Sequence, residues 1–297
     1  MSSPRDPHPR YKDVHEAARI YFLPNLATAG NLFFGFVAMI LCIRAHYVAL
    51  DDPEMTNHLY TQAVWCILLA AVCDTLDGRL ARFGGRESLF GKEFDSIADT
   101  VSFGVAPALM VFFLILSPSS PVSKYSDFFR DVGWFIGYIY LLCVAVRLAR
   151  FNVLTSPLLP GVAEDAVTKD FMGLPSPAAA GFVASLVLVL LNWGEAQRWA
   201  LLLPPLLLLV AFLMVSNIPY PSFKHIGWQT QTRARSFILF VVLIAVVILF
   251  HEFSFAILFL SYIFYGLGRH LRRSWRKSHR PANQSSSPEE PDEEDAF

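Results

Sequence analysis

The chain has 297 residues, of which 54% are hydrophobic and only 16% are charged, whereas a soluble domain carries about 25% charged residues. Its net charge of −1 provides no overall basic field for binding nucleic acid. The four cysteines all lie in apolar segments without a CxxC pair, so neither disulfides nor a zinc site is expected.

Long apolar segments predict an all-α polytopic membrane protein with about eight transmembrane helices. These segments are continuous and lack the alternation of barrel strands. Only His251 and Glu252 separate the last two, which form either two short spans or a re-entrant or tilted hairpin. The expected spans are residues 25–46, 59–82, 95–116, 133–151, 177–193, 199–216, 235–250 and 252–268.

The predicted membrane domain, residues 24–268, has a polar segment at each end. Within the N-terminal segment, 1–23, residues 11–23 form either a short interfacial helix or a solvated lead-in. The C-terminal tail, 269–297, begins with a basic block that is expected to bind anionic lipid head groups. It then becomes acidic, and its composition predicts disorder because it cannot bury apolar area.

The distribution of basic residues predicts the orientation in the membrane. Across the predicted spans, 20 of the 24 Lys and Arg residues fall on the side that holds both termini. Because cytoplasmic loops are enriched in Lys and Arg, both termini are predicted to be cytoplasmic, in a multi-pass protein of the cell inner or plasma membrane. The connection between the second and third spans lies on the same side.

Four aspartates stand at this cytoplasmic end of the second and third spans. A carboxylate within a bilayer costs about 2.5–3.5 kcal/mol on insertion scales, so the cluster requires a function. Spacings of three and four residues place each pair on one helix face, beside small residues that leave room for a ligand. The frame is Asp74-x-x-Asp77-Gly78-x-x-Ala81-Arg82, eight residues, then Gly91-x-x-x-Asp95-x-x-x-Asp99.

The short connection after Gly84 and Gly85 makes the two helices antiparallel neighbours, so the carboxylates are expected to converge. Oxygen ligands without His or Cys favour Mg²⁺, Mn²⁺ or Ca²⁺, and Arg82 adds positive charge for a diphosphate. Two other interpretations remain: pairing of the acids with Arg79, Arg82 and Arg86, or an ion site of a cation-coupled transporter.

The aspartate frame resembles, at every defined position, the signature of the CDP-alcohol phosphatidyltransferases. The resemblance implies a six-helix membrane core, a homodimer, and an enzyme that displaces CMP from a CDP-linked lipid by an alcohol. It implies that two divalent cations, Mg²⁺ or Mn²⁺, are held by Asp74, Asp77, Asp95 and Asp99, with Asp99 also the catalytic general base. CDP-diacylglycerol would be bound by Asp74, Gly78, Ala81, Arg82, Gly91 and Asp95.

Flanking blocks resemble the integral-membrane phosphatidylserine synthases of this family, which implies L-serine as acceptor and phosphatidylserine and CMP as products. The blocks are PNLATAGNLFFGF (24–36), FGKEFDSIADTVSFGVAPA (90–108), RLARFN (147–152) and FMGLPSPAAAG (171–181).

Two arginines, Arg147 and Arg150, lie three residues apart and are suited to pair with the carboxylate of L-serine, although Arg at span ends also snorkels to lipid phosphates. Asn152 and Ser102 are weaker candidates for serine contacts. A sister enzyme that uses glycerol 3-phosphate or an inositol phosphate remains an alternative, and it would call for a denser basic cluster.

Overall fold

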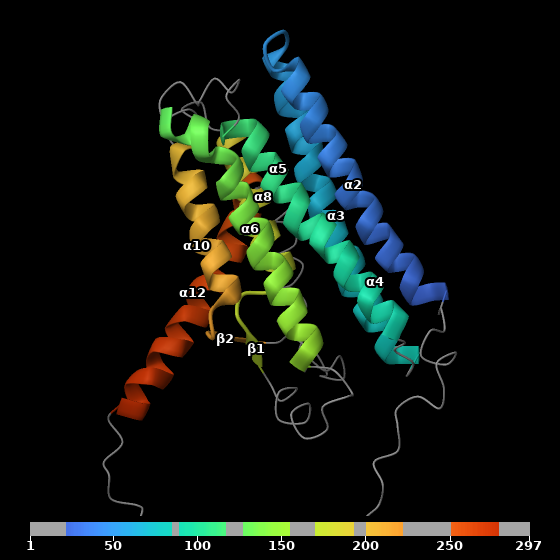
Figure 1. Ribbon diagram of the computed structural model, residues 1–297, viewed down its shortest axis with the longest axis vertical. Helices are drawn as coiled ribbons and strands as arrows, with labels where there is room; N and C mark the ends of the chain where they lie inside the picture. The colour runs from blue at the N-terminus through green and yellow to red at the C-terminus, as the bar shows by residue number, and fades with distance from the viewer. Residues whose placement is uncertain are drawn as a thin grey trace, which may run out of the picture.

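The computed structural model describes residues 22–84, 89–116, 127–154, 170–192, 200–221 and 251–278. This part of the chain is almost entirely helical (Figure 1), which confirms the predicted all-α class. A continuous helical stretch contains the second half of the aspartate frame: α4 (Leu89–Asp99), the π-helical turn η1 (Thr100–Val105), α5 (Ala106–Val111) and η2 (Phe112–Leu116). The other long helices are α2 (Phe22–Val48), α3 (Pro53–Gly84), α6 (Asp127–Leu154), α8 (Ser176–Asn192), α10 (Leu203–Val215) and α12 (His251–Ser278).

Within the described residues, five helical segments are long and apolar enough to cross a membrane: Asn25–Val48, Pro53–Leu80, Leu89–Ile115, Asp131–Leu154 and Phe253–Arg272. The chain is therefore an integral membrane protein. The shorter apolar helices α8 and α10 coincide with the fifth and sixth expected spans. The seventh expected span, 235–250, lies outside the described residues, so the count of eight stays a prediction.

The ends of the chain differ from the predicted boundaries. Helix α12 continues through Ser278, ten residues beyond the expected end of the last span at 268, so this part of the basic block is helical. Arg and Lys are good helix formers, and Leu271 and Trp275 lie four residues apart on this extension. Helix α2 begins at Phe22. The remaining parts of both predicted segments, 1–21 with the possible interfacial helix and 279–297, lie outside the described residues.

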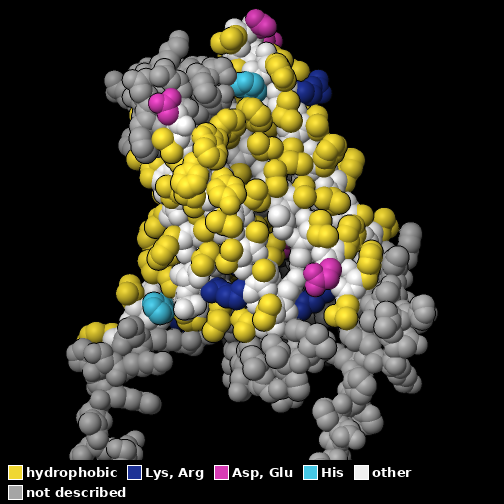
Figure 2. Space-filling view, in the orientation of Figure 1, with side chains coloured by type: hydrophobic (Ala, Val, Ile, Leu, Met, Phe, Trp, Pro, Cys, Tyr) yellow, Lys and Arg dark blue, Asp and Glu magenta, His cyan; other side chains and the backbone are white. Residues whose placement is uncertain are grey.

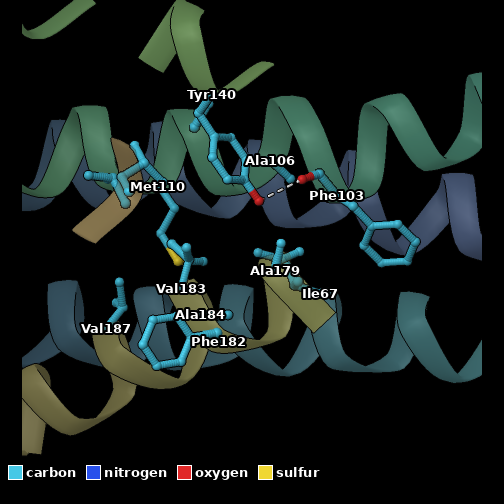
Figure 3. Packing of buried hydrophobic residues seen from close by; sticks show 14 of the residues in the cluster. Ile67, Phe103, Ala106, Met110, Tyr140, Ala179, Phe182, Val183, Ala184 and Val187 are labelled. Carbon is cyan, nitrogen blue, oxygen red and sulfur yellow. Dashed lines mark hydrogen bonds between the residues drawn. The ribbon is translucent and has the colours of Figure 1, made fainter. Parts of the chain in front are cut away.

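The core is centred on α8, most of whose residues are buried. Figure 3 shows its small and branched side chains, among them Ala179 and Val183, facing Ile67 of α3 and Met110 of α5. Across this layer, the Tyr140 hydroxyl of α6 donates a 3.0 Å hydrogen bond to the Phe103 carbonyl of η1 (Figure 3). Small residues in close contact allow helices to pack tightly in a membrane.

One end of the bundle collects the elements that surround the aspartate frame. The C-terminal ends of α3 and α6, the N-terminal ends of α2 and α4, and a small sheet all lie at the lower end in Figure 1. In that sheet β1 (Asp170–Met172) pairs antiparallel with β2 (Pro219–Pro221). Figure 2 shows basic side chains, together with acidic and histidine side chains, at the same lower edge of a largely apolar face. The site therefore sits where a membrane-embedded bundle meets a charged rim.

Candidate active site

Three of the four aspartates meet in space. Asp74 of α3 and Asp95 and Asp99 of α4 each offer a carboxylate oxygen, and these oxygens lie within 4.8 Å of one another. Asp95 and Asp99 are one helical turn apart on α4, so both side chains face α3. Helix α2 packs against both α3 and α4, and the spacing of the aspartates brings their carboxylates together where these helices meet it.

Asp77 is buried next to this cluster, although it is not one of the three converging ligands. The Thr28 hydroxyl of α2 donates a 2.9 Å hydrogen bond to Asp77 Oδ2. The Asp77 side chain also lies within hydrogen-bonding reach of Asp95. Helix α2 thus fixes one carboxylate at the edge of the cluster.

Asp99 is held by a second polar residue of α2. The Asn31 amide Nδ2 donates a 2.9 Å hydrogen bond to Asp99 Oδ1, and the main-chain carbonyl of Asn31 accepts a 2.8 Å bond from the Ser102 hydroxyl. All three residues are buried. Asp99 is the last residue of α4 before the π-helical turn η1, a distortion that often occurs at functional sites. The structure therefore fixes the orientation of the Asp99 carboxylate.

Arg147 lies beside the acidic cluster rather than in a position from which it could snorkel. Its side chain is only 8% exposed, and its guanidinium is close enough to interact electrostatically with Asp99 and Asp74. Its Nη1 donates a 2.8 Å hydrogen bond to the hydroxyl of Ser176, at the start of α8. The guanidinium is thus directed to the interior of the site.

Arg150 and Asn152 make their hydrogen bonds to protein groups. Arg150 donates 3.0 Å bonds to the carbonyls of Val215 and Met172, and so ties α6 to the end of α10 and to β1. The Asn152 amide donates a 2.8 Å bond to the Ser96 hydroxyl of α4. The Ser102 hydroxyl is already bonded to the Asn31 carbonyl. Of the four predicted serine-binding residues, Arg147 is therefore the one with an electrostatic interaction with the carboxylates of Asp74 and Asp99.

The small residues of the frame leave space beside the cluster. A Cβ added at Gly78 would meet nothing within 4 Å, so α3 is open to a ligand at that point. Gly91 lies near the start of α4. The side chains of Ala81 and Arg82 lie outside the described residues, and their predicted contacts to CDP-diacylglycerol stay predictions.

The donor set fits a divalent cation of the hard class. Three carboxylates converge without a His or Cys partner among the described residues, and such oxygen ligands suit Mg²⁺ or Mn²⁺. Like charges this close repel one another unless a cation or a proton compensates them. Asn31 Oδ1 is buried at the same place with no partner among the described residues, so a polar group is expected there.

Three residues that hydrogen-bond to side chains of the site had not been assigned to it from the sequence: Thr28, Asn31 and Ser176. Thr28 and Asn31 are three residues apart and share one face of an apolar span, which is a signal of a polar contact across helices. Their partners could not be identified from that signal, because Asn31 and Asp99 are separated by 68 positions.

Comparison with known proteins agrees with this geometry. Residues 21–216 match the family model described as CDP-alcohol phosphatidyltransferase. A Helicobacter pylori protein named CDP-diacylglycerol–serine O-phosphatidyltransferase is 31% identical over 85% of this chain and 92% of its own length. A Mycobacterium leprae protein of the same name is 32% identical over 70% of this chain and 65% of its own length. An archaetidylserine synthase of Methanothermobacter thermautotrophicus is 32% identical over 70% of this chain and 73% of its own length. The chain belongs to the CDP-alcohol phosphatidyltransferase family.

Proposed function

We propose that this protein transfers the phosphatidyl group of CDP-diacylglycerol to the hydroxyl of L-serine, releasing CMP and phosphatidylserine. The observation that carries the proposal is the convergence of Asp74, Asp95 and Asp99 beside a buried arginine, at the end of a membrane bundle. The names of the relatives support L-serine as the acceptor. Membership of this family favours a transferase over a cation-coupled transporter.

Asp99 is the proposed general base. The serine hydroxyl oxygen forms a bond to the phosphorus that carries the diacylglycerol, and the bond from that phosphorus to the CMP oxygen breaks. The hydroxyl has a pKa far above neutral, so its proton must pass to a positioned acceptor as the bond forms. Asp99 Oδ1 is held by Asn31, which leaves Oδ2 to receive this proton.

The remaining carboxylates have a separate role. Asp74, Asp77, Asp95 and Asp99 are proposed to hold two divalent cations, Mg²⁺ or Mn²⁺, which when bound supply positive charge to the diphosphate and to the departing CMP. Thr28 orients Asp77 for this task. Gly78 leaves space for the diphosphate next to the carboxylates, and Arg82 is proposed to bind it.

Arg147 is the proposed partner of the serine carboxylate. Its guanidinium is close enough to interact electrostatically with Asp99, so a serine bound to it would present its hydroxyl toward the proposed base. The hydrogen bonds of Arg150, Asn152 and Ser102 to protein groups support a role for these three residues in positioning the site. A guanidinium is suited to a carboxylate because it donates two parallel hydrogen bonds.

The proposed orientation places both termini and the active site at the cytoplasmic face. There L-serine can reach the site from water, and the charged rim lies at the level of the lipid head groups. A homodimer is proposed from the family alone.

The direct test measures CMP release from CDP-diacylglycerol by the purified protein with L-serine, glycerol 3-phosphate or an inositol phosphate, each with and without EDTA. Of the three acceptors, we expect turnover with L-serine and not with the other two. EDTA should abolish this turnover, and excess Mg²⁺ or Mn²⁺ should restore it. Turnover with glycerol 3-phosphate but not with L-serine would assign the protein to the sister activity. Turnover that EDTA leaves intact would contradict the metal site.

A further inference from the structure

Helix α12 lies beyond residues 21–216, which match the family model, and it packs against α8 and β2. A Cβ at Gly266 of α12 would overlap the ring of Tyr220 in β2, so the strand and the helix are in close contact there. One turn earlier on α12, the Tyr262 ring lies 5.6 Å from the Tyr220 ring, centroid to centroid. The sheet therefore holds one tyrosine against another from α12.

These tyrosines are connected to the site through Arg147. The hydroxyl of Tyr262 is close enough to interact electrostatically with both Arg147 and Tyr220. Tyr262 of α12 thus links Tyr220 of β2, whose ring it contacts, to the electrostatic surroundings of Arg147 on α6. All three side chains can donate hydrogen bonds, and the phenols are neutral near pH 7.

Two of these side chains have donors without a partner. Arg147 Nε and the Tyr220 hydroxyl are both buried, and neither has a hydrogen-bond partner among the described residues. Their side chains are only 8% and 0% exposed, respectively. Buried donors in folded proteins are nearly always paired, so unpaired donors in one region indicate a place for an acceptor group that binds there.

We propose that Arg147, Tyr220 and Tyr262 form a subsite for the carboxylate of the amino-acid acceptor, so that α12 completes the active site. The inference rests on the proposed function, since it concerns the acceptor of that reaction. The single guanidinium matches the single negative charge of a carboxylate. A phosphate dianion would need a second cation, and the Arg150 guanidinium is occupied by the carbonyls of Val215 and Met172.

The test compares L-serine with serinol, in which a hydroxymethyl group replaces the carboxylate, as acceptors for CMP release. The variants are Tyr220→Phe and Tyr262→Phe, which keep the rings that pack against α12 and β2. The matched control is Tyr140→Phe, because it removes another buried hydroxyl, one that bonds to the Phe103 carbonyl away from the subsite.

We expect KM for L-serine to rise roughly tenfold in each subsite variant, as for the loss of one hydrogen bond to a charged group. KM for CDP-diacylglycerol and the activity with serinol should stay within about twofold of wild type, the additivity error of distant sites. Tyr140→Phe should leave KM for L-serine unchanged.

Two results would overturn the subsite alone: an unchanged KM for L-serine in both variants, or an equal loss with L-serine and serinol. Wild-type protein that does not use L-serine would instead overturn the proposed function, and the subsite with it. Thermal unfolding in detergent establishes that each variant is folded.

Discussion

Replacing Asn31 by Ala should slow the chemical step without preventing folding. The change removes the 2.9 Å hydrogen bond from Nδ2 to Asp99 Oδ1, between two buried side chains. A hydrogen bond to a charged group contributes about 1.5–3 kcal/mol, and roughly 1.4 kcal/mol corresponds to a factor of ten in rate. Because the freed carboxylate can rotate away from the serine hydroxyl, we expect kcat to fall roughly 10- to 150-fold.

The assay is CMP release at saturating CDP-diacylglycerol, L-serine and divalent cation, so that altered binding does not appear as altered kcat. Asn192→Ala is the control, since its amide donates a 3.1 Å hydrogen bond to the Leu188 carbonyl of its own helix and to no other group in the described part of the chain. The control should keep wild-type kcat. Wild-type kcat in Asn31→Ala, with a folded protein by thermal unfolding, would refute the assignment of Asn31 as the residue that positions Asp99.

Two further contrasts follow from the site. Arg147→Ala should raise KM for L-serine roughly 10- to 100-fold, in line with a lost charge-assisted pair. Arg150→Ala should mainly lower the thermal stability, because it releases bonds to β1 and α10. Equal effects of the two variants on KM for L-serine would contradict these separate roles. Gly78→Val should raise KM for CDP-diacylglycerol in a folded protein because its side chain enters open space. Gly35→Val should instead reduce the yield of folded protein, since a Cβ there overlaps Ser102; a folded, active Gly35→Val variant would contradict the close packing of α2 against η1.

The helices and the aspartate cluster could be predicted from the sequence because both depend on local spacing. Apolar runs of the length of a bilayer specify helices on their own. Asp95 and Asp99 share a face at a spacing of four, and the short connection to α3 brings Asp74 opposite to them. These features require no knowledge of contacts between distant segments.

Arg147 and Arg150 show where local spacing is insufficient. Both lie near the end of α6, three residues apart, and the sequence predicted the same role for both. The structure separates them, since Arg147 is buried beside Asp99 while Arg150 holds carbonyls of the segments that follow. Which partner each guanidinium meets depends on how α10 and the β1–β2 pair fold over α6.

The same limit applies to α2 and α12. Asn31 could not be assigned a specific role from the sequence, because its partner lies on another helix. The extension of α12 to Ser278 was not predicted because the basic block was interpreted only as a lipid-binding segment, whereas Arg and Lys continue a helix readily. The contribution of Tyr262 to the site depends on the contact of α12 with β2, which no motif in that region indicates.

The central claim is that Asp99 accepts the proton of L-serine during phosphatidyl transfer. The most direct measurement is the formation of phosphatidylserine from CDP-diacylglycerol and L-serine by wild-type protein and by Asp99→Asn, at saturating substrates and divalent cation. We expect wild type to form phosphatidylserine and CMP in equal amounts, and the folded variant to lose roughly 10²- to 10⁴-fold in kcat, the contribution of a positioned general base. A folded Asp99→Asn protein that keeps wild-type kcat would contradict the account.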